Sequence, residues 1–230
     1  IGEGEYAYEP VEGESGVWSA PNRSQELRSR ISPNGLEVFP RTTSAAGLGA
    51  PWKLRLRTKS FGRVGDQLEL GPASLTVQDR RSELDHGLLT EWFENREDGI
   101  EQGWTIAAPP PGTDPLWIGL EIGGELTFRI DDGARSGVLV DSNGEARLRY
   151  RDLKVFDATG AMLPARLVSS PDGVGIQIDD TNAIYPVLVD PVLTGPAWTA
   201  ESDQNGAAFG TSVAGAGDVN SDDYSDVIVG

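Results

Sequence analysis

The feature that most constrains the fold is a repeated alternation of apolar and polar residues in short segments. In residues 52–57, Trp, Leu and Leu alternate with Lys, Arg and Arg. Leu126, Phe128 and Ile130 alternate with polar neighbours in the same way. Since successive side chains of a β-strand point to opposite faces, each segment predicts a strand with one buried face. We expect the basic face of 52–57 to be solvated or paired with glutamates.

Turn signals separate these segments along the chain. We expect further strands at 36–39, 67–70, 74–78, 88–94, 103–107, 116–122, 125–130, 137–140, 145–151, 153–156, 165–169, 175–178 and 184–189. Between them stand Asn34-Gly35, Asp98-Gly99, Gly123-Gly124, Asp132-Gly133, Asn143-Gly144, Thr159-Gly160 and Asp172-Gly173. Glycine tolerates the positive φ of tight hairpin turns. The pattern therefore predicts an all-β protein built from antiparallel, sandwich-like sheets.

The chain divides into three regions by composition. Residues 1–19 are acidic and glycine-bearing and are expected to form an extended arm or an edge strand. Residues 20–193 carry the strands and form the main β-rich module. The proline run at 108–112 marks either a long loop or a division of that module. The strand pattern ends near Pro191, and residues 194–230 form a separate C-terminal region.

Two segments are expected to lack strands. Residues 24–31 predict a short helix, because Leu27 and Ile31, four positions apart, lie on one helical face. Residues 80–87 resemble a polar loop and contain His86, the only histidine in the chain. A histidine-based zinc cluster is thereby excluded, and we expect His86 to be structural or solvent-exposed.

The net charge of the chain excludes some classes of binding partner. With 19 basic and 36 acidic residues, the formal net charge is −17. This argues against binding nucleic acid or an anionic membrane surface, both of which reward clustered Lys and Arg. The chain has no cysteine and no apolar run long enough to span a bilayer. We expect a secreted, extracellular or cell-surface protein whose signal peptide is not part of the given chain.

Two groups of residues are candidates for a catalytic or a binding site. One tripeptide is a candidate for glycosylation. An acidic cluster contains Glu91, Glu94, Glu97, Asp98 and Glu101, and an aromatic group contains Trp92, Phe93, Trp104 and Trp117. The first has the residue types of a glycosidase pair and the second those of a sugar-stacking platform. Abundant acids and aromatic core residues account for both, so we expect no enzyme. Asn22-Arg23-Ser24 fits an N-glycosylation sequon.

A loop near the C-terminus has the residue types and spacing that a calcium ion needs. Ca²⁺ takes about six to eight oxygen ligands, and alternate side chains of a tight loop can surround it. Asp218, Asn220 and Asp222 alternate, Tyr224 offers its backbone carbonyl, and Asp226 closes the shell. Their mutual repulsion would be relieved by a cation between them. An acidic turn without metal is the alternative.

The residues around this loop resemble a known repeat. Phe209-Gly210, Ser212-Val213-Ala214, Asp218-Val219-Asn220 and Val227-Ile228-Val229-Gly230 together are similar to the FG-GAP repeat of integrin-α-like β-propellers. The resemblance covers about the last thirty residues and implies a Ca²⁺ loop between the first strands of a propeller blade. Asp223 stands where that repeat usually has glycine.

A second, more diffuse resemblance covers residues 20–193. Residues 89–95 and 99–106, with Tyr185-Pro186 and Asp190-Pro191, resemble the β-rich module that precedes such repeats in secreted bacterial proteins. Together the two resemblances imply a noncatalytic structural or adhesive protein that belongs to a larger surface protein or assembly. The alternatives are a carbohydrate-binding module, an accessory domain of a secreted enzyme, and a fibre subunit that self-associates or binds a protein partner by adding its C-terminal strands.

Overall fold

The protein is all-β in the part of the chain that its structure describes. The computed structural model describes residues 6–41, 52–194, 212–217 and 226–229, which contain strands β1 to β19 and no helix. Accordingly, none of these ranges holds a helix that could cross a membrane. The chain divides into two compact units, Ile1–Pro196 and Ala197–Gly230.

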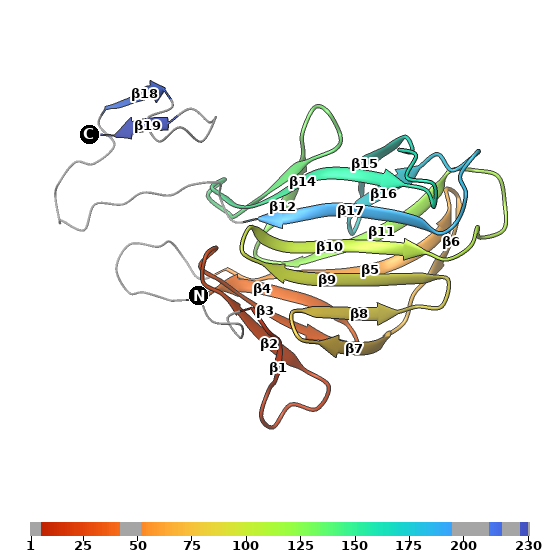
Figure 1. The fold of residues 1–230 in the computed structure, drawn as a ribbon, viewed down its shortest axis with the longest axis horizontal. Helices are drawn as coiled ribbons and strands as arrows, with labels where there is room; N and C mark the ends of the chain where they lie inside the picture. The colour runs from red at the N-terminus through yellow and green to blue at the C-terminus, as the bar shows by residue number, and fades with distance from the viewer. Residues whose placement is uncertain (1–5, 42–51, 195–211, 218–225, 230) are drawn as a thin grey trace. The chain divides into compact units, whose positions relative to one another are not determined.

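Sheet A of the first unit runs in the order β1-β2-β3-β4-β5-β11-β16-β15, with β6 added to β5 (Figure 1). All its neighbours are antiparallel. The strands are β1 (Glu9–Pro10), β2 (Trp18–Asn22), β3 (Leu27–Ser32), β4 (Gly35–Pro40), β5 (Leu54–Arg63), β6 (Asp66–Glu69), β11 (Leu116–Gly124), β15 (Ala165–Ser170) and β16 (Gly173–Ile178).

Sheet B is also antiparallel and runs in the order β12-β13-β14-β17-β10-β9-β8-β7. Its strands are β7 (Ser74–Gln78), β8 (Arg81–Asp85), β9 (Leu89–Arg96), β10 (Gly99–Ile106), β12 (Thr127–Ile130), β13 (Gly137–Val140), β14 (Ala146–Phe156) and β17 (Val187–Thr194). Residues 107–115 connect β10 of sheet B to β11 of sheet A, so the proline run at 108–112 lies between two sheets of one unit.

The two sheets share one hydrophobic core, which gives the unit a sandwich-like arrangement. Leu36 and Leu54 from sheet A and Phe93 and Trp104 from sheet B are all fully or almost fully buried in it. The predicted alternation holds in β5, where buried Leu54 and Leu56 alternate with polar side chains. Full burial of an apolar side chain of this size stabilises a fold by roughly 1.5–3 kcal/mol.

Two of the three basic side chains at residues 53–57 are paired with glutamates, and Arg55 is exposed, in line with the expected solvated or glutamate-paired face. Lys53 lies 3.3 Å from Glu37, and Arg57 lies 3.7 Å from Glu121. Both pairs are only partly buried, so each adds little to stability.

The expected helix and polar loop are both strands. Leu27 and Ile31, four positions apart, also share a face in a strand of period two, and both are buried in β3. The segment around Arg80 forms β8, where Ser82 and Leu84 face the core and Arg81 and Glu83 face outward. The alternation of buried and outward-facing side chains in β8 is not apparent in the sequence, because most residues of the segment are polar. The two strands expected at 145–151 and 153–156 are one strand, β14, with a register shift between Arg151 and Lys154.

The second unit contains an antiparallel hairpin. Strands β18 (Val213–Gly217) and β19 (Asp226–Val229) pair with Val213 opposite Val229 and Gly217 opposite Asp226. The register shifts between Gly215 and Gly217. Gly217 and Asp226 thus form the two ends of the connection between the strands.

Candidate functional site

Most of the predicted metal ligands lie outside the described residues. Asp218, Asn220, Asp222 and Tyr224 fall in the 218–225 stretch, and for Asp226 the structure describes only the backbone, at the start of β19. Among the described residues, no group of three or more His, Cys, Asp or Glu side chains is placed to hold a metal ion. What the structure contributes to this candidate is the pairing of the strands on either side of the loop.

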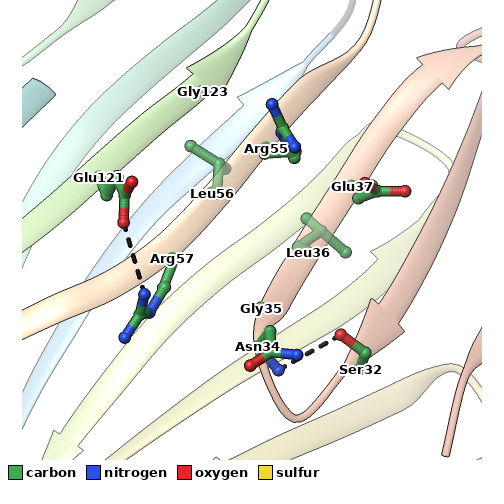
Figure 2. A pocket seen from close by; sticks show the side chains of 10 residues that line it. All are labelled: Ser32, Asn34, Gly35, Leu36, Glu37, Arg55, Leu56, Arg57, Glu121 and Gly123. Atoms are coloured by element: carbon green, nitrogen blue, oxygen red, sulfur yellow. Dashed lines mark hydrogen bonds and ion pairs between the residues drawn. The ribbon is translucent and has the colours of Figure 1, made fainter. Parts of the chain in front are cut away.

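A shallow groove of about 440 Å³ lies on sheet A, where the β3–β4 hairpin, β5 and β11 come together (Figure 2). Its lining residues are Ser32, Asn34, Gly35, Leu36, Glu37, Arg55, Leu56, Arg57, Glu121 and Gly123. Figure 2 shows Arg57 pointing toward Glu121, the ion pair described above. The guanidinium of Arg57 also donates to the Leu70 carbonyl at 2.8 Å. The groove therefore contains one ion pair between lining residues, Arg57 and Glu121, together with the charged side chains of Arg55 and Glu37.

Two glycines that line the groove, Gly35 and Gly123, leave the neighbouring backbone uncovered because they have no side chain. A Cβ at Gly35 would overlap the Leu56 carbonyl oxygen, and φ at Gly35 is +117°, a conformation that other residues rarely adopt. Gly123 is the register partner of Arg55, whose Nε would lie 3.4 Å from a Cβ added there. The Arg55 side chain therefore rests against the β11 backbone.

The predicted acidic cluster is divided between the two faces of sheet B. Glu91 faces the core, whereas Glu94 and Glu101 are register partners on the outer face. Arg80 lies 3.3 Å from Glu94, and Arg96 lies 2.8 Å from Glu101. A glycosidase pair requires two carboxyl groups beside one substrate bond, so Glu91 cannot act together with the outer glutamates.

Asp190 lies beside the outer acidic residues, although no pattern in its own segment indicates this. Burial, followed by the neighbouring Glu101 carboxylate, raises the pKa of Asp190 to about 6. Its Oδ1 is buried and has no hydrogen-bond partner among the described residues. Asp190 lies on β17 opposite Lys154 of β14, and its carboxyl group interacts with that of Glu101 on β10, 89 positions away in the sequence. Because two carboxylates this close repel each other, a proton on Asp190 relieves the repulsion from Glu101.

The aromatic group does not form a platform. Phe93 and Trp104 are fully buried in the core. Trp92 is 6% exposed on the outer face of sheet B, and the Arg81 guanidinium lies 4.4 Å from its ring centroid. Trp117 lies on sheet A, against Gly175 of the same sheet. These four aromatic side chains therefore do not meet in one exposed plane.

Glu91 is a carboxylic acid side chain in the interior of the first unit. It is fully buried on β9, and its Oε1 accepts a hydrogen bond from Gln102 Nε2 at 2.7 Å. Burial raises its pKa to about 7, while the Gln102 amide and the nearby Thr58 hydroxyl hold that increase back. The sequence contained a signal for its position, because Leu89, Glu91 and Phe93 occupy alternate positions of one strand.

His86 is half-buried, and the asparagine of the sequon is buried. His86 directly follows β8, and burial lowers the pKa of its half-buried imidazole. Asn22 is 1% exposed, and its Nδ2 donates to Asn95 Oδ1 and to the Arg96 carbonyl, at 2.8 Å each. The folded chain thus offers this amide nitrogen to its own core and not to a glycan.

The chain was compared with protein-family models, with curated proteins and with solved structures, and none of the three comparisons found a match.

Proposed function

We propose that this chain is a noncatalytic structural or adhesive module of an extracellular protein, in which a Ca²⁺ ion stabilises an FG-GAP-type hairpin. The observation that carries the proposal is the pairing of Gly217 with Asp226. It brings together the two ends of an eight-residue connection, which contains Asp218, Asn220, Asp222 and Tyr224. A connection closed in this way supports a set of oxygen ligands around one cation.

The ligand chemistry follows from the sequence of the connection. Asp218, Asn220, Asp222 and Asp226 supply side-chain oxygens, and Tyr224 supplies its backbone carbonyl. Carboxylates held this close repel one another unless a cation lies between them. Because a folded loop binds the ion better than an unfolded one, binding stabilises the hairpin. The metal has a structural role and takes part in no reaction.

The larger assembly is the second part of the proposal. Repeat architectures bury their cores by stacking neighbouring units, and one hairpin is marginally stable on its own. Strands β18 and β19 are the first strands of a propeller-type blade, which is completed by further repeats, by a protein partner or by another copy of the chain. Size-exclusion chromatography tests the last case, since self-association through these strands gives a species larger than the monomer.

Hydrogen exchange tests the stabilising role of the ion. In the presence of Ca²⁺, the backbone amides of Val227, Ile228 and Val229 are expected to exchange more slowly than in a chelator. The double variant Asp218→Ala with Asp222→Ala is expected to abolish that difference. Equal exchange with and without Ca²⁺ in the unmodified chain would contradict the proposal.

A further inference from the structure

The core of the first unit contains a polar group that joins the two sheets. It consists of Glu91, Gln102 and Trp104 from sheet B and Thr58 from sheet A, and we call it the Glu91 group. The Gln102 amide donates to Glu91 Oε1 at 2.7 Å, and Trp104 Nε1 donates to Thr58 Oγ1 at 2.9 Å. All four side chains are at most 1% exposed. The group therefore lies beyond the reach of solvent.

Two oxygens of this group are left without hydrogen-bond partners. Within the described residues, Glu91 Oε2 and Gln102 Oε1 are both buried and have no partner at hydrogen-bond distance. The Thr58 hydroxyl, which accepts from Trp104, lies close enough to Glu91 to lower its pKa but does not replace a partner at that distance. If Glu91 is ionised, both oxygens only accept hydrogen bonds, so neither can satisfy the other. A buried acceptor without a donor costs free energy, and a buried charge without a counterion costs more.

One proton changes this arrangement. A carboxylic acid carries one O–H donor, which turns Oε2 from an acceptor into a donor. The adjacent Gln102 side chain already donates to Oε1 of the same carboxyl group and has a free acceptor in its own carbonyl oxygen. An acid and an amide can thus pair through two hydrogen bonds, and one proton satisfies both unpaired oxygens.

We propose that Glu91 is held as a neutral carboxylic acid that donates its proton to Gln102, and that loss of this proton at higher pH weakens the contact between the two sheets.

The residues around Glu91 offer no positive charge to hold a carboxylate. Its register partners are Leu84 on β8 and Trp104 on β10, and Thr58 approaches from sheet A. No ion pair of the described residues includes Glu91. The titratable neighbour is Tyr150 on β14, whose own pKa is raised well above its usual value by burial and, second, by the Glu91 charge. Tyr150 therefore stays neutral while Glu91 titrates.

The direction of the pH effect follows from linkage. The folded-state pKa of Glu91 is about 7, above the ordinary value of 4.5. The folded chain therefore binds the proton more tightly than the unfolded chain does. This contribution to stability is fully present below pH 4.5 and is lost progressively as the pH rises through 7. The Glu91 group lies in the first unit, Ile1–Pro196.

Urea unfolding of the full chain at a series of pH values tests this proposal. The comparison is with Glu91→Gln, which keeps the shape of the side chain but cannot titrate. The unfolding equilibrium constant of the unmodified chain, relative to that of Glu91→Gln, is expected to rise about tenfold per pH unit between pH 4.5 and 7 and to level off above. A ratio that does not change with pH overturns the proposal.

Glu94→Gln is the matched control. Glu94 lies on the same strand but on the outer face of sheet B, beside Arg80. Its variant is expected to keep the pH profile of the unmodified chain in the range from 5 to 8. If Glu94→Gln instead removes the pH dependence, the effect does not belong to the buried carboxyl group.

Titration of the Glu91 carboxyl group by NMR tests the proposal even if Glu91→Gln fails to fold. In the unmodified chain with ¹³C-labelled glutamate, the carboxyl resonance of Glu91 is expected to titrate with a midpoint near pH 7. A folded chain in which every glutamate carboxyl titrates near 4.5 overturns the proposal.

Discussion

The side-chain amide of Asn22 donates to Asn95 Oδ1 at 2.8 Å and so links strand β2 of sheet A to strand β9 of sheet B. Asn22 Nδ2 donates to the Arg96 carbonyl as well, and Asn95 Nδ2 donates to the carbonyls of Tyr6 and Pro21. Both asparagines are at most 1% exposed. The pair fastens the N-terminal segment of the chain to the second sheet.

Replacing Asn22 by alanine should weaken this link. The change leaves Asn95 Oδ1 and the Arg96 carbonyl without their donor in a buried place. We expect the free energy of unfolding to fall by roughly 2–4 kcal/mol, measured by urea denaturation. Ser24→Ala removes the same sequon at an exposed position and serves as the control. Equal effects of the two changes would show that the buried amide does not carry the stability.

Adding one methyl group at Gly103 should strain sheet B. Gly103 is the register partner of Trp92, and a Cβ there would overlap the indole ring. The ring has little room to move because the Arg81 guanidinium already lies over it, 4.4 Å from its centroid. We expect Gly103→Ala to cost roughly 1–3 kcal/mol in urea unfolding.

Gly133 provides the matched control for that substitution. A Cβ added at Gly133 meets no atom within 4 Å. Gly133→Ala should therefore leave the unfolding midpoint nearly unchanged. A Gly103→Ala variant as stable as Gly133→Ala would mean that Trp92 does not pack as described.

Asp157 should make the fold sensitive to acid. Hydrogen bonds from the Thr159 side chain first, and then from the backbone amides of Ile184, Thr159 and Ala161, hold its pKa at about 2, below the usual 3.8. The stabilisation is present above pH 3.8 and is lost as the pH falls through 2. Asp157→Asn should therefore be less stable than the unmodified chain at pH 5, with the difference shrinking toward pH 2.

The same acid titration has a clear control. Asp132 lies exposed in the turn between β12 and β13. Asp132→Asn should follow the unmodified chain over the whole pH range. A constant gap between Asp157→Asn and the unmodified chain from pH 5 to pH 2 would contradict the role assigned to the Asp157 carboxylate.

Local alternation predicted the strands better than it predicted their ends. The alternation of Leu54 and Leu56 with basic residues predicted a strand here. The strand, β5, continues to Arg63, a charged residue that is only 5% exposed. Arg63 can be buried because it donates to the Pro110 and Asp114 carbonyls and pairs with Asp180, at 2.6 Å. These partners lie 47, 51 and 117 positions away in the sequence, so no local pattern predicts that Arg63 is buried.

The interior polar residues were missed for the same reason. Asn22 and Asn95 are 73 positions apart, and each is unremarkable in its own segment. Glu91 is in phase with buried Leu89 and Phe93, but a carboxylate ordinarily belongs at the surface and was grouped with the acidic residues around it. The hairpin around the predicted calcium loop was expected from the FG-GAP resemblance. Its ligand positions remain a prediction from the sequence.

Isothermal titration calorimetry with Ca²⁺ tests the central proposal most directly. The unmodified chain is expected to bind one Ca²⁺ with high occupancy, and Asp218→Ala with Asp222→Ala is expected to lose that binding. Ser221→Ala, which changes a loop residue between two predicted ligands, should keep it. If the unmodified chain binds no Ca²⁺, or if the double variant binds as the unmodified chain does, the calcium-stabilised hairpin is wrong.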